Sequence, residues 1–323
     1  MKRRAFLGVV GAGPWLASVR YRAAQDTVPK IGYLTPNGQG VPLEQGFHQR
    51  LRELGYSEGS SIIIEWRRAK DREDLAAPLA FELVQRQVDL IVTVGTSAAR
   101  AALNATATIP IVFLSGAPVS SGLTTSMARP DRSATGISLL TSELFPKRLE
   151  YLHWLAPQAR RIAYLVVPSN ALSASQIEAV QKGAHLLGLQ LIRLDARDPG
   201  ELDVALRAIP HSGTNAVLIG GDSLIYSNMA KVARAVRRAK LPAMFPYADY
   251  RDYGALMCYG PDTKETGRKM AAYVDKILKG ARPADLPIEE ISTYKLIIDL
   301  RVAHELGINV PQKLLYRADE VIR

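Results

Sequence analysis

The chain has 323 residues, of which 47% are apolar and 22% are charged, so its composition is that of a folded protein long enough for two domains. The formal net charge is +10, but five of the basic residues precede position 23, and the other Lys and Arg residues form only short groups. Nucleic-acid binding calls for clustered basic residues with interleaved aromatic ones, so this pattern argues against it.

The first 24 residues have the pattern of an export signal. Residues 2–4 (KRR) form a charged start, and residues 5–19 form an apolar run too short to span a membrane. The Arg3-Arg4 pair resembles a twin-arginine signal, and a general secretory signal is the alternative. We therefore expect a periplasmic protein. An uncleaved anchor is a further alternative, because Arg22 stands where a small residue is preferred before a cleavage site.

Strands alternate with helices from residue 30 onward. Apolar runs predict strands at residues 30–34, 61–66, 88–94 and 110–114, and helical spacing predicts helices at 44–54, 75–84 and 97–103. Such alternation is typical of a doubly wound parallel sheet that helices cover on both faces.

The second half of the chain repeats the sequence pattern of the first half. Residues 161–170 (RIAYLVVPSN) match the start of the first series, and residues 215–223 (NAVLIGGDS) match DLIVTVGTS at 89–97. A proline opens the strand in both LPAMFPY (241–247) and IPIVFLS (109–115). The order of the strands and the chemistry of the loops therefore predict two similar α/β lobes.

The boundaries of the lobes are placed at turn-rich segments. We expect an export signal at 1–24, lobe 1 at 28–142 and 254–282, and lobe 2 at 143–253 and 283–323. Ligands of open α/β sheets bind outside the carboxyl ends of the strands. If the two lobes face each other through those ends, the loops enclose a cleft that a hinge can close over a small molecule.

The junction at Gly95 is the best candidate for holding a polar group. Gly95 lets another group approach the backbone, Thr96 and Ser97 offer hydroxyls, and the start of the helix presents unpaired N–H donors. This chemistry suits a carboxylate. Asp222, at the matching junction of lobe 2, is a candidate to bind an ammonium group, with the capping of its own helix as the alternative.

Aromatic and hydroxyl side chains near other strand ends complete the expected site. Tyr33, Tyr226 and Tyr247 are candidates for an aromatic wall, or else pack within the lobes. Polar residues at strand ends either bind the solute or cap turns. The full set expected to contact the solute is Tyr33, Thr35, Gly95, Thr96, Ser97, Ser115, Gly116, Ser169, Asn170, Asp222, Ser223 and Tyr247.

Long phrases of the sequence resemble the substrate-binding proteins of ABC transporters, in the family that includes the tryptophan/tyrosine binders. The phrases lie at residues 51–70 (LRELGYSEGSSIIIEWRRAK), 88–96, 108–123, 128–152, 254–262 (GALMCYGPD), 277–290 and 314–322 (LLYRADEVI). The resemblance implies a type I periplasmic-binding fold and a receptor that presents a small solute, such as an aromatic or branched amino acid, to an inner-membrane permease. Relatives usually carry Gly-Asp-Pro where this chain has Gly116-Ala117-Pro118, so a contact through that aspartate has no counterpart here.

Catalytic and cofactor motifs are missing from the sequence. The five histidines are scattered without metal-ligand spacing, no nucleophile elbow or phosphate-binding loop is present, and the single cysteine, Cys258, lies in an apolar run typical of a core. We expect a monomer without cofactor, metal or catalysis. An α/β enzyme using the same cleft is the alternative, and a sensory module is disfavoured because no membrane span or signalling domain follows residue 323.

Overall fold

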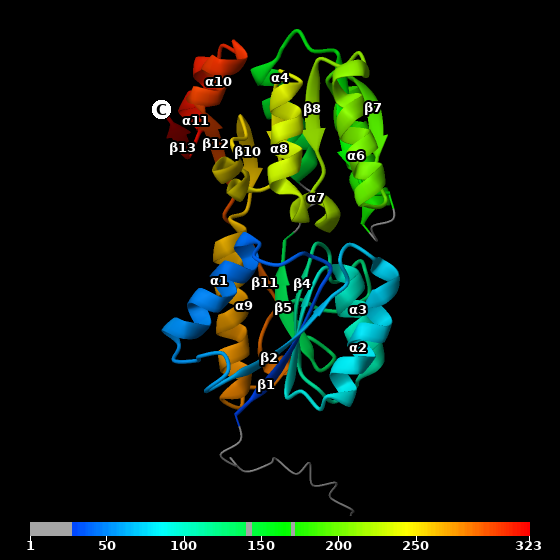
Figure 1. Cartoon of the computed structure of the whole chain (residues 1–323), viewed down its shortest axis with the longest axis vertical. Coiled ribbons are helices and arrows are strands. Elements are labelled where there is room, and N and C mark those ends of the chain that lie inside the picture. The colour runs from blue at the N-terminus through cyan, green and yellow to red at the C-terminus, as the bar shows by residue number, and fades with distance from the viewer. Residues whose placement is uncertain (1–27, 140–143, 169–171) are drawn as a thin grey trace, which may run out of the picture.

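Two lobes, each built on its own β-sheet, lie end to end in the computed structural model, which describes residues 28–139, 144–168 and 172–323 (Figure 1). The predicted export signal and Ser169 and Asn170 fall outside the described residues. The prediction of an α/β fold with two mainly parallel sheets is confirmed.

Lobe 1 holds a sheet whose strands are β1 (Lys30–Thr35), β2 (Ile63–Arg68), β3 (Leu90–Val94), β4 (Ile111–Ser115), β5 (Ala134–Ser138) and β11 (Glu289–Glu290). Their order is β11-β5-β4-β3-β1-β2, and every pair is parallel. Its helices are α1 (Pro42–Glu53), α2 (Ala76–Gln85), α3 (Thr96–Ala105) and α9 (Thr263–Leu278). Strands β3 and β4 are buried along their whole length, as expected of parallel strands covered on both faces.

Lobe 2 holds β6 (Arg161–Val166), β7 (Gln190–Asp195), β8 (Ala216–Ile219), β9 (Ala243–Phe245), β10 (Met257–Gly260), β12 (Lys295–Asp299) and β13 (Glu320–Ile322). Their order is β13-β12-β10-β9-β8-β6-β7, and only the pair of β10 and β12 among them is antiparallel. Its helices are α4 (Phe145–Leu155), α5 (Ser173–Leu186), α6 (Pro199–Ala208), α7 (Ser223–Ser227), α8 (Met229–Arg238), α10 (Leu300–Leu306) and α11 (Gln312–Arg317).

The boundaries between the lobes differ from the sequence-based ones at two places. Strand β10, expected in lobe 1, pairs with β9 through Cys258 and Phe245 and therefore belongs to lobe 2. Strand β11, expected in lobe 2, pairs with β5 through Glu289 and Ile137 in lobe 1. The sequence pattern of a strand shows that it is buried but not which of the two sheets it joins. The chain thus crosses between the lobes after β5, between β10 and α9, and between β11 and β12.

The buried side chain of Arg148 fixes the part of lobe 2 that faces one of these crossings. Its guanidinium donates to the carbonyl oxygens of Tyr259, at 2.9 Å, and Pro246, at 2.8 Å, and lies over the Phe145 ring. Burial lowers the pKa of Arg148 to about 10, so it stays charged at neutral pH. Helix α4 is thereby tied to the carboxyl ends of β9 and β10.

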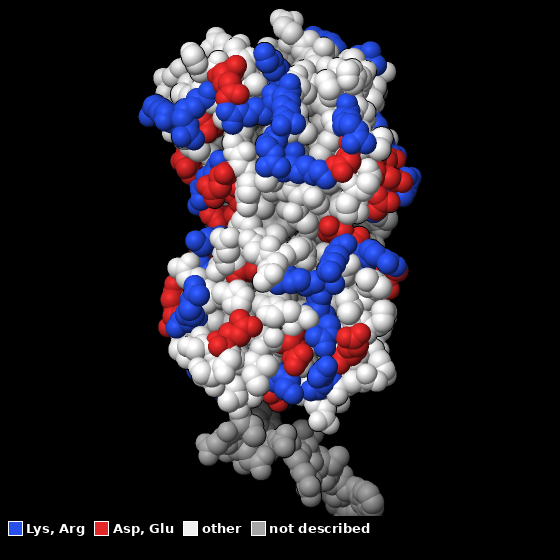
Figure 2. Space-filling view, in the orientation of Figure 1, with Lys and Arg blue, Asp and Glu red and all other residues white. Residues whose placement is uncertain are grey.

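On the face of the molecule shown in Figure 2, charged side chains are scattered over both lobes. On the face shown, Lys and Arg gather over α8, whose opposite side buries Val232. Two of these cations have acidic partners: Lys231 pairs with Asp203 and Arg237 with Glu305. Because exposed ion pairs contribute at most about 1 kcal/mol each, this surface adds little to the stability of the fold.

Helices α1 and α9 of lobe 1 pack backbone against backbone, which requires glycine on both. A Cβ atom at Gly46 would lie 1.8 Å from the carbonyl oxygen of Lys264, and one at Gly267 would lie 1.9 Å from that of Leu43. Neither carbonyl can move without shifting its helix. The contact matters for the site because the first residues of both helices reach the space between the lobes.

The variant Gly46→Ala should therefore lose stability, by about 1–3 kcal/mol, since the added methyl group forces α1 away from α9. Chemical denaturation followed by circular dichroism would measure the loss. The control is Gly38→Ala, where a Cβ atom would meet nothing within 4 Å. Equal stability of the two variants would show that the helices can separate without penalty.

Candidate functional site

Two adjoining hollows lie between the lobes, where the carboxyl ends of the strands of both sheets meet. They share the residues at their junction, namely Val94, Gly95, Thr96 and Ser223. Strand β3 and helix α3 bring the first three from lobe 1, and α7 brings Ser223 from lobe 2. The hollows are therefore two ends of one cleft, as the strand-end rule predicts.

The larger hollow has an uncharged lining among the described residues. Its apolar and aromatic members are Leu43, Val94, Leu114, Leu139, Leu172, Tyr226 and Tyr247, and its polar or glycine members are Asn37, Gly95, Thr96, Ser115, Gly116, Gln176, Gly221, Ser223, Thr263 and Thr266. The rings of Tyr226 and Tyr247 meet edge to face with centroids 5.3 Å apart, and this pair forms an aromatic wall. Such a surface suits a planar apolar group.

Charged side chains line the smaller hollow. Asp71, Arg197 and Asp222 border it, together with Thr35 and Ser97. Asp71 follows strand β2 of lobe 1, whereas Arg197 and Asp222 follow β7 and β8 of lobe 2. The cleft is thus divided into a neutral end and an end with carboxylates and a guanidinium.

Helix α3 begins at the junction of the two hollows. Gly95 has a φ of +92°, a conformation that glycine adopts readily and other residues rarely do. A Cβ atom there would lie 3.9 Å from Ser223 Oγ of the opposite lobe. No side chain caps α3, so its first N–H groups and its positive dipole end face the junction. A carboxylate of a bound solute would find donors here.

Most of the residues predicted from the sequence line this cleft. Gly95, Thr96, Ser115, Gly116, Ser223 and Tyr247 line the larger hollow, and Thr35, Ser97 and Asp222 line the smaller one. The hydroxyls of Thr96 and Ser115 lie 2.8 Å apart, and the Tyr247 hydroxyl donates to the carbonyl of Gly221 at 2.6 Å. Whether these residues contact a solute stays a prediction.

The interpretation of Tyr33 as a wall residue is wrong. Its side chain is fully buried within lobe 1, where the ring lies 4.4 Å from that of Trp66 and 5.1 Å from that of Phe47, measured between centroids. Tyr33 stands two residues before the end of β1, so its ring packs beneath α1. Thr35, at the end of the same strand, reaches the cleft instead.

Asp222 is not held as a helix cap. It occupies the N-cap position of α7, but its side chain makes no capping hydrogen bond there. One of its carboxylate oxygens accepts instead from the backbone N–H of Val167, at 3.4 Å. The carboxylate therefore turns back toward β6, on the lobe 2 side of the smaller hollow.

Several lining residues were not predicted, and Asp71 is the most informative of them. It lies in the loop after β2, and the same strand-end rule that selected the other loops would have selected this one. Asn37, Gln176 and Thr263 were missed for a different reason: they lie beyond the strand ends, and only the packing of the lobes brings them to the hollow.

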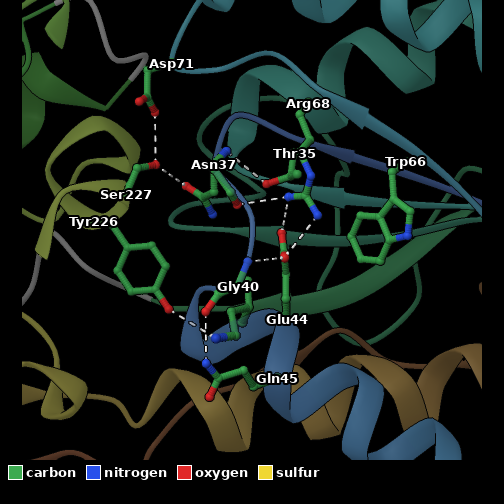
Figure 3. A network of polar contacts seen from close by, with 12 residues as sticks. Thr35, Asn37, Gly40, Glu44, Gln45, Trp66, Arg68, Asp71, Tyr226 and Ser227 are labelled. Carbon is green, nitrogen blue, oxygen red and sulfur yellow. Dashed lines mark hydrogen bonds and ion pairs between the residues drawn. The ribbon is translucent and has the colours of Figure 1, made fainter. Parts of the chain in front are cut away.

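Hydrogen bonds between the lobes hold the cleft closed (Figure 3). The Tyr226 hydroxyl accepts from the backbone N–H of Leu43 at 3.2 Å and lies 2.5 Å from the hydroxyl of Thr263. The Ser227 hydroxyl lies 3.1 Å from Asp71 Oδ1 and 3.3 Å from Asn37 Oδ1. Helix α7 of lobe 2 is therefore an element that meets lobe 1 through side-chain hydrogen bonds.

Two further searches of the described residues gave no site. No three His, Cys, Asp or Glu side chains come together in an arrangement that could hold a metal ion. None of the helices in this part of the chain combines the length and the apolar character that crossing a membrane requires.

Comparison with known proteins identifies a family. The model of the ABC transporter substrate binding protein family matches residues 41–322. A curated relative, the tyrosine-binding protein of Clostridioides difficile (strain R20291), is 26% identical over 257 residues, which make up 79% of this chain and 74% of the relative. A conserved domain protein from Vibrio cholerae has a TM-score of 0.80 at 25% identity, over 91% of this chain and 100% of its own.

Two further solved structures differ in their ligand state. The ABC domain from Streptococcus pneumoniae in complex with L-Trp has a TM-score of 0.78 at 26% identity, over 92% of this chain and 100% of that one. The ligand-free, open structure of a substrate-binding protein with adhesive properties from Clostridium difficile has a TM-score of 0.61 at 25% identity, over 92% and 99%. At almost equal identity and coverage, the whole-chain similarity is thus higher to the complex than to the open structure.

Proposed function

The chain belongs to the ABC transporter substrate-binding protein family, and we propose that it is an exported receptor that captures an aromatic amino acid between its lobes and delivers it to an inner-membrane permease. The observation that carries the proposal is the uncharged hollow walled by Tyr226 and Tyr247, which opens onto the start of α3 and is enclosed by both lobes.

The chemistry of the cleft supports an aromatic amino acid over other small solutes. The larger hollow offers the side chain an apolar and aromatic surface without any charged group among its described residues. The start of α3 offers N–H donors to a carboxylate. The names of the relatives agree with this assignment, since one is a tyrosine-binding protein and another was solved with L-Trp.

Delivery and location follow from the same proposal. The basic and apolar start of the sequence would direct export to the periplasm, and the receptor would work there as a monomer. A permease can distinguish a loaded receptor by its closed lobes, because closure brings surfaces of both lobes into a fixed relative position. Among the described residues, the lining of the larger hollow contains no acid–base pair, and this favours binding over catalysis.

A panel of solutes tests the proposed function. Protein that has been unfolded, dialysed and refolded to remove any bound molecule should show a melting temperature that rises with the logarithm of the concentration of L-Trp, L-Tyr or L-Phe. L-Leu and L-Ile should give smaller shifts, because they cannot contact the tyrosine wall with a planar face. L-Lys, L-Glu and D-ribose serve as controls. A shift with ribose and none with any amino acid would overturn the assignment.

The closing contact can be tested with the solute that binds best in this panel. Tyr226→Phe leaves the buried N–H of Leu43 without its partner in the closed form only, so we expect an affinity about ten-fold lower. Isothermal titration calorimetry would measure the affinity of wild type and variant.

The matched control is Tyr250→Phe, which removes a hydrogen bond to the carbonyl of Ile225 inside lobe 2. It should lower the stability of lobe 2 and change the affinity by less than about two-fold, since no contact between the lobes is lost. Equal losses of affinity in both variants would mean that the Tyr226 hydroxyl acts only through packing within lobe 2.

A further inference from the structure

Asp71 occupies a backbone conformation that aspartate rarely adopts. Lys70 and Asp71 have consecutive φ angles of +49° and +62°, in the left-handed region. A single Asp or Asn in this region is tolerated, but two successive residues with side chains are costly. This conformation positions the carboxylate of Asp71, which lines the smaller hollow and points toward α7 (Figure 3).

The loop that carries Asp71 is anchored on both sides. The backbone N–H groups of Ala69 and Asp71 donate to the carbonyls of Thr35 and Pro36, at 2.9 and 2.8 Å. Arg68, just before the loop, forms a two-pronged ion pair with the buried carboxylate of Glu44, at 2.5 and 3.1 Å. The carboxylate of Asp71 is therefore held in place by the surrounding chain.

This carboxylate has a hydroxyl as its neighbour but no cation. Ser227 donates to it, and in the described part of the chain no Lys, Arg or His forms an ion pair with it. Arg197 borders the same hollow but is exposed and pairs with Glu201 at 3.1 Å. Burial raises the pKa of Asp71 to about 6, which the hydrogen bond from Ser227 opposes. A carboxylate that loses water without gaining a cation is unfavourable, and a cation supplied by a ligand would correct this.

We propose that Asp71 binds the ammonium group of the solute and thereby selects α-amino acids over molecules that lack the amino group. This inference rests on the proposed function. The solute's carboxylate would lie at the start of α3, its ammonium group in the smaller hollow, and its side chain in the larger hollow beyond Gly95 and Ser223.

The distribution of charge in the cleft supports this orientation. An ammonium group in the larger hollow would meet no charged residue among those described there. Ala117, in the loop after β4, carries no carboxylate. The two carboxylates of the cleft, Asp71 from lobe 1 and Asp222 from lobe 2, border the smaller hollow, so an ammonium group placed there would attract both lobes.

A double-mutant cycle between protein and solute tests the assignment. Wild type and Asp71→Asn would be titrated by calorimetry with L-Trp and with 3-(indol-3-yl)propionate, which has the same ring and carboxylate but no amino group. We expect Asp71→Asn to weaken L-Trp binding about ten- to hundred-fold, because a charge-assisted hydrogen bond is lost. The indolepropionate should bind the variant as well as or better than it binds wild type. The same pair of titrations with L-Tyr and 3-(4-hydroxyphenyl)propionate applies if L-Tyr binds more tightly.

Ser227→Ala is the matched control, since it removes the hydrogen bond to Asp71 but leaves the charge. It should weaken both solutes to a similar, small extent. If Asp71→Asn also weakens both solutes equally, Asp71 is only a latch between the lobes and the inference is overturned. If the wild-type protein binds none of the four molecules, the proposed function itself is contradicted. Circular dichroism and melting curves would verify that both variants fold.

Discussion

The site depends on the close approach of α7, in lobe 2, to the chain that follows β1 in lobe 1. Tyr226 OH meets the N–H of Leu43 and the hydroxyl of Thr263, and both contacts are buried. Buried polar groups need partners, so these groups are satisfied by each other only while the lobes are closed. Tyr226 and Tyr247 both lie in lobe 2, so their ring contact forms the aromatic wall within that lobe, and the approach of lobe 1 encloses it.

The backbone at the junction of the hollows has to leave room for this approach. Gly95 ends β3 and starts α3 with a positive φ, and a side chain there would stand in the space between the lobes close to Ser223. The uncapped start of α3 is thereby brought to the point where the neutral and the charged parts of the cleft meet. A molecule that is charged at one end and apolar at the other matches this division.

Much of the architecture could be predicted from the sequence, because buried strands and their loops leave local patterns. Nine of the twelve residues that the sequence suggested for the site, which follow from the junction at Gly95 and from the repeat in the second half, line the cleft. The wrong predictions concern features that the local sequence pattern does not determine. Tyr33 lies two residues before the end of its strand, and only the pairing of β10 with β9 shows which sheet β10 joins. The role of Asp71 depends on loop geometry and on the closure of the lobes, which no short stretch of sequence records.

The partial burial of a carboxylate that has no cationic partner among the described residues also bears on when the cleft closes. In an open cleft Asp71 is surrounded by water and keeps its charge without penalty, whereas closure removes part of that water and offers the hydroxyl of Ser227 in return. The empty closed form is thus disfavoured, and a solute with an ammonium group removes the penalty. A ligand shifts a conformational equilibrium only by its difference in affinity for the two forms. If Asp71 binds the ammonium group as we propose, it creates such a difference, and the same carboxylate would also disfavour closure without a solute.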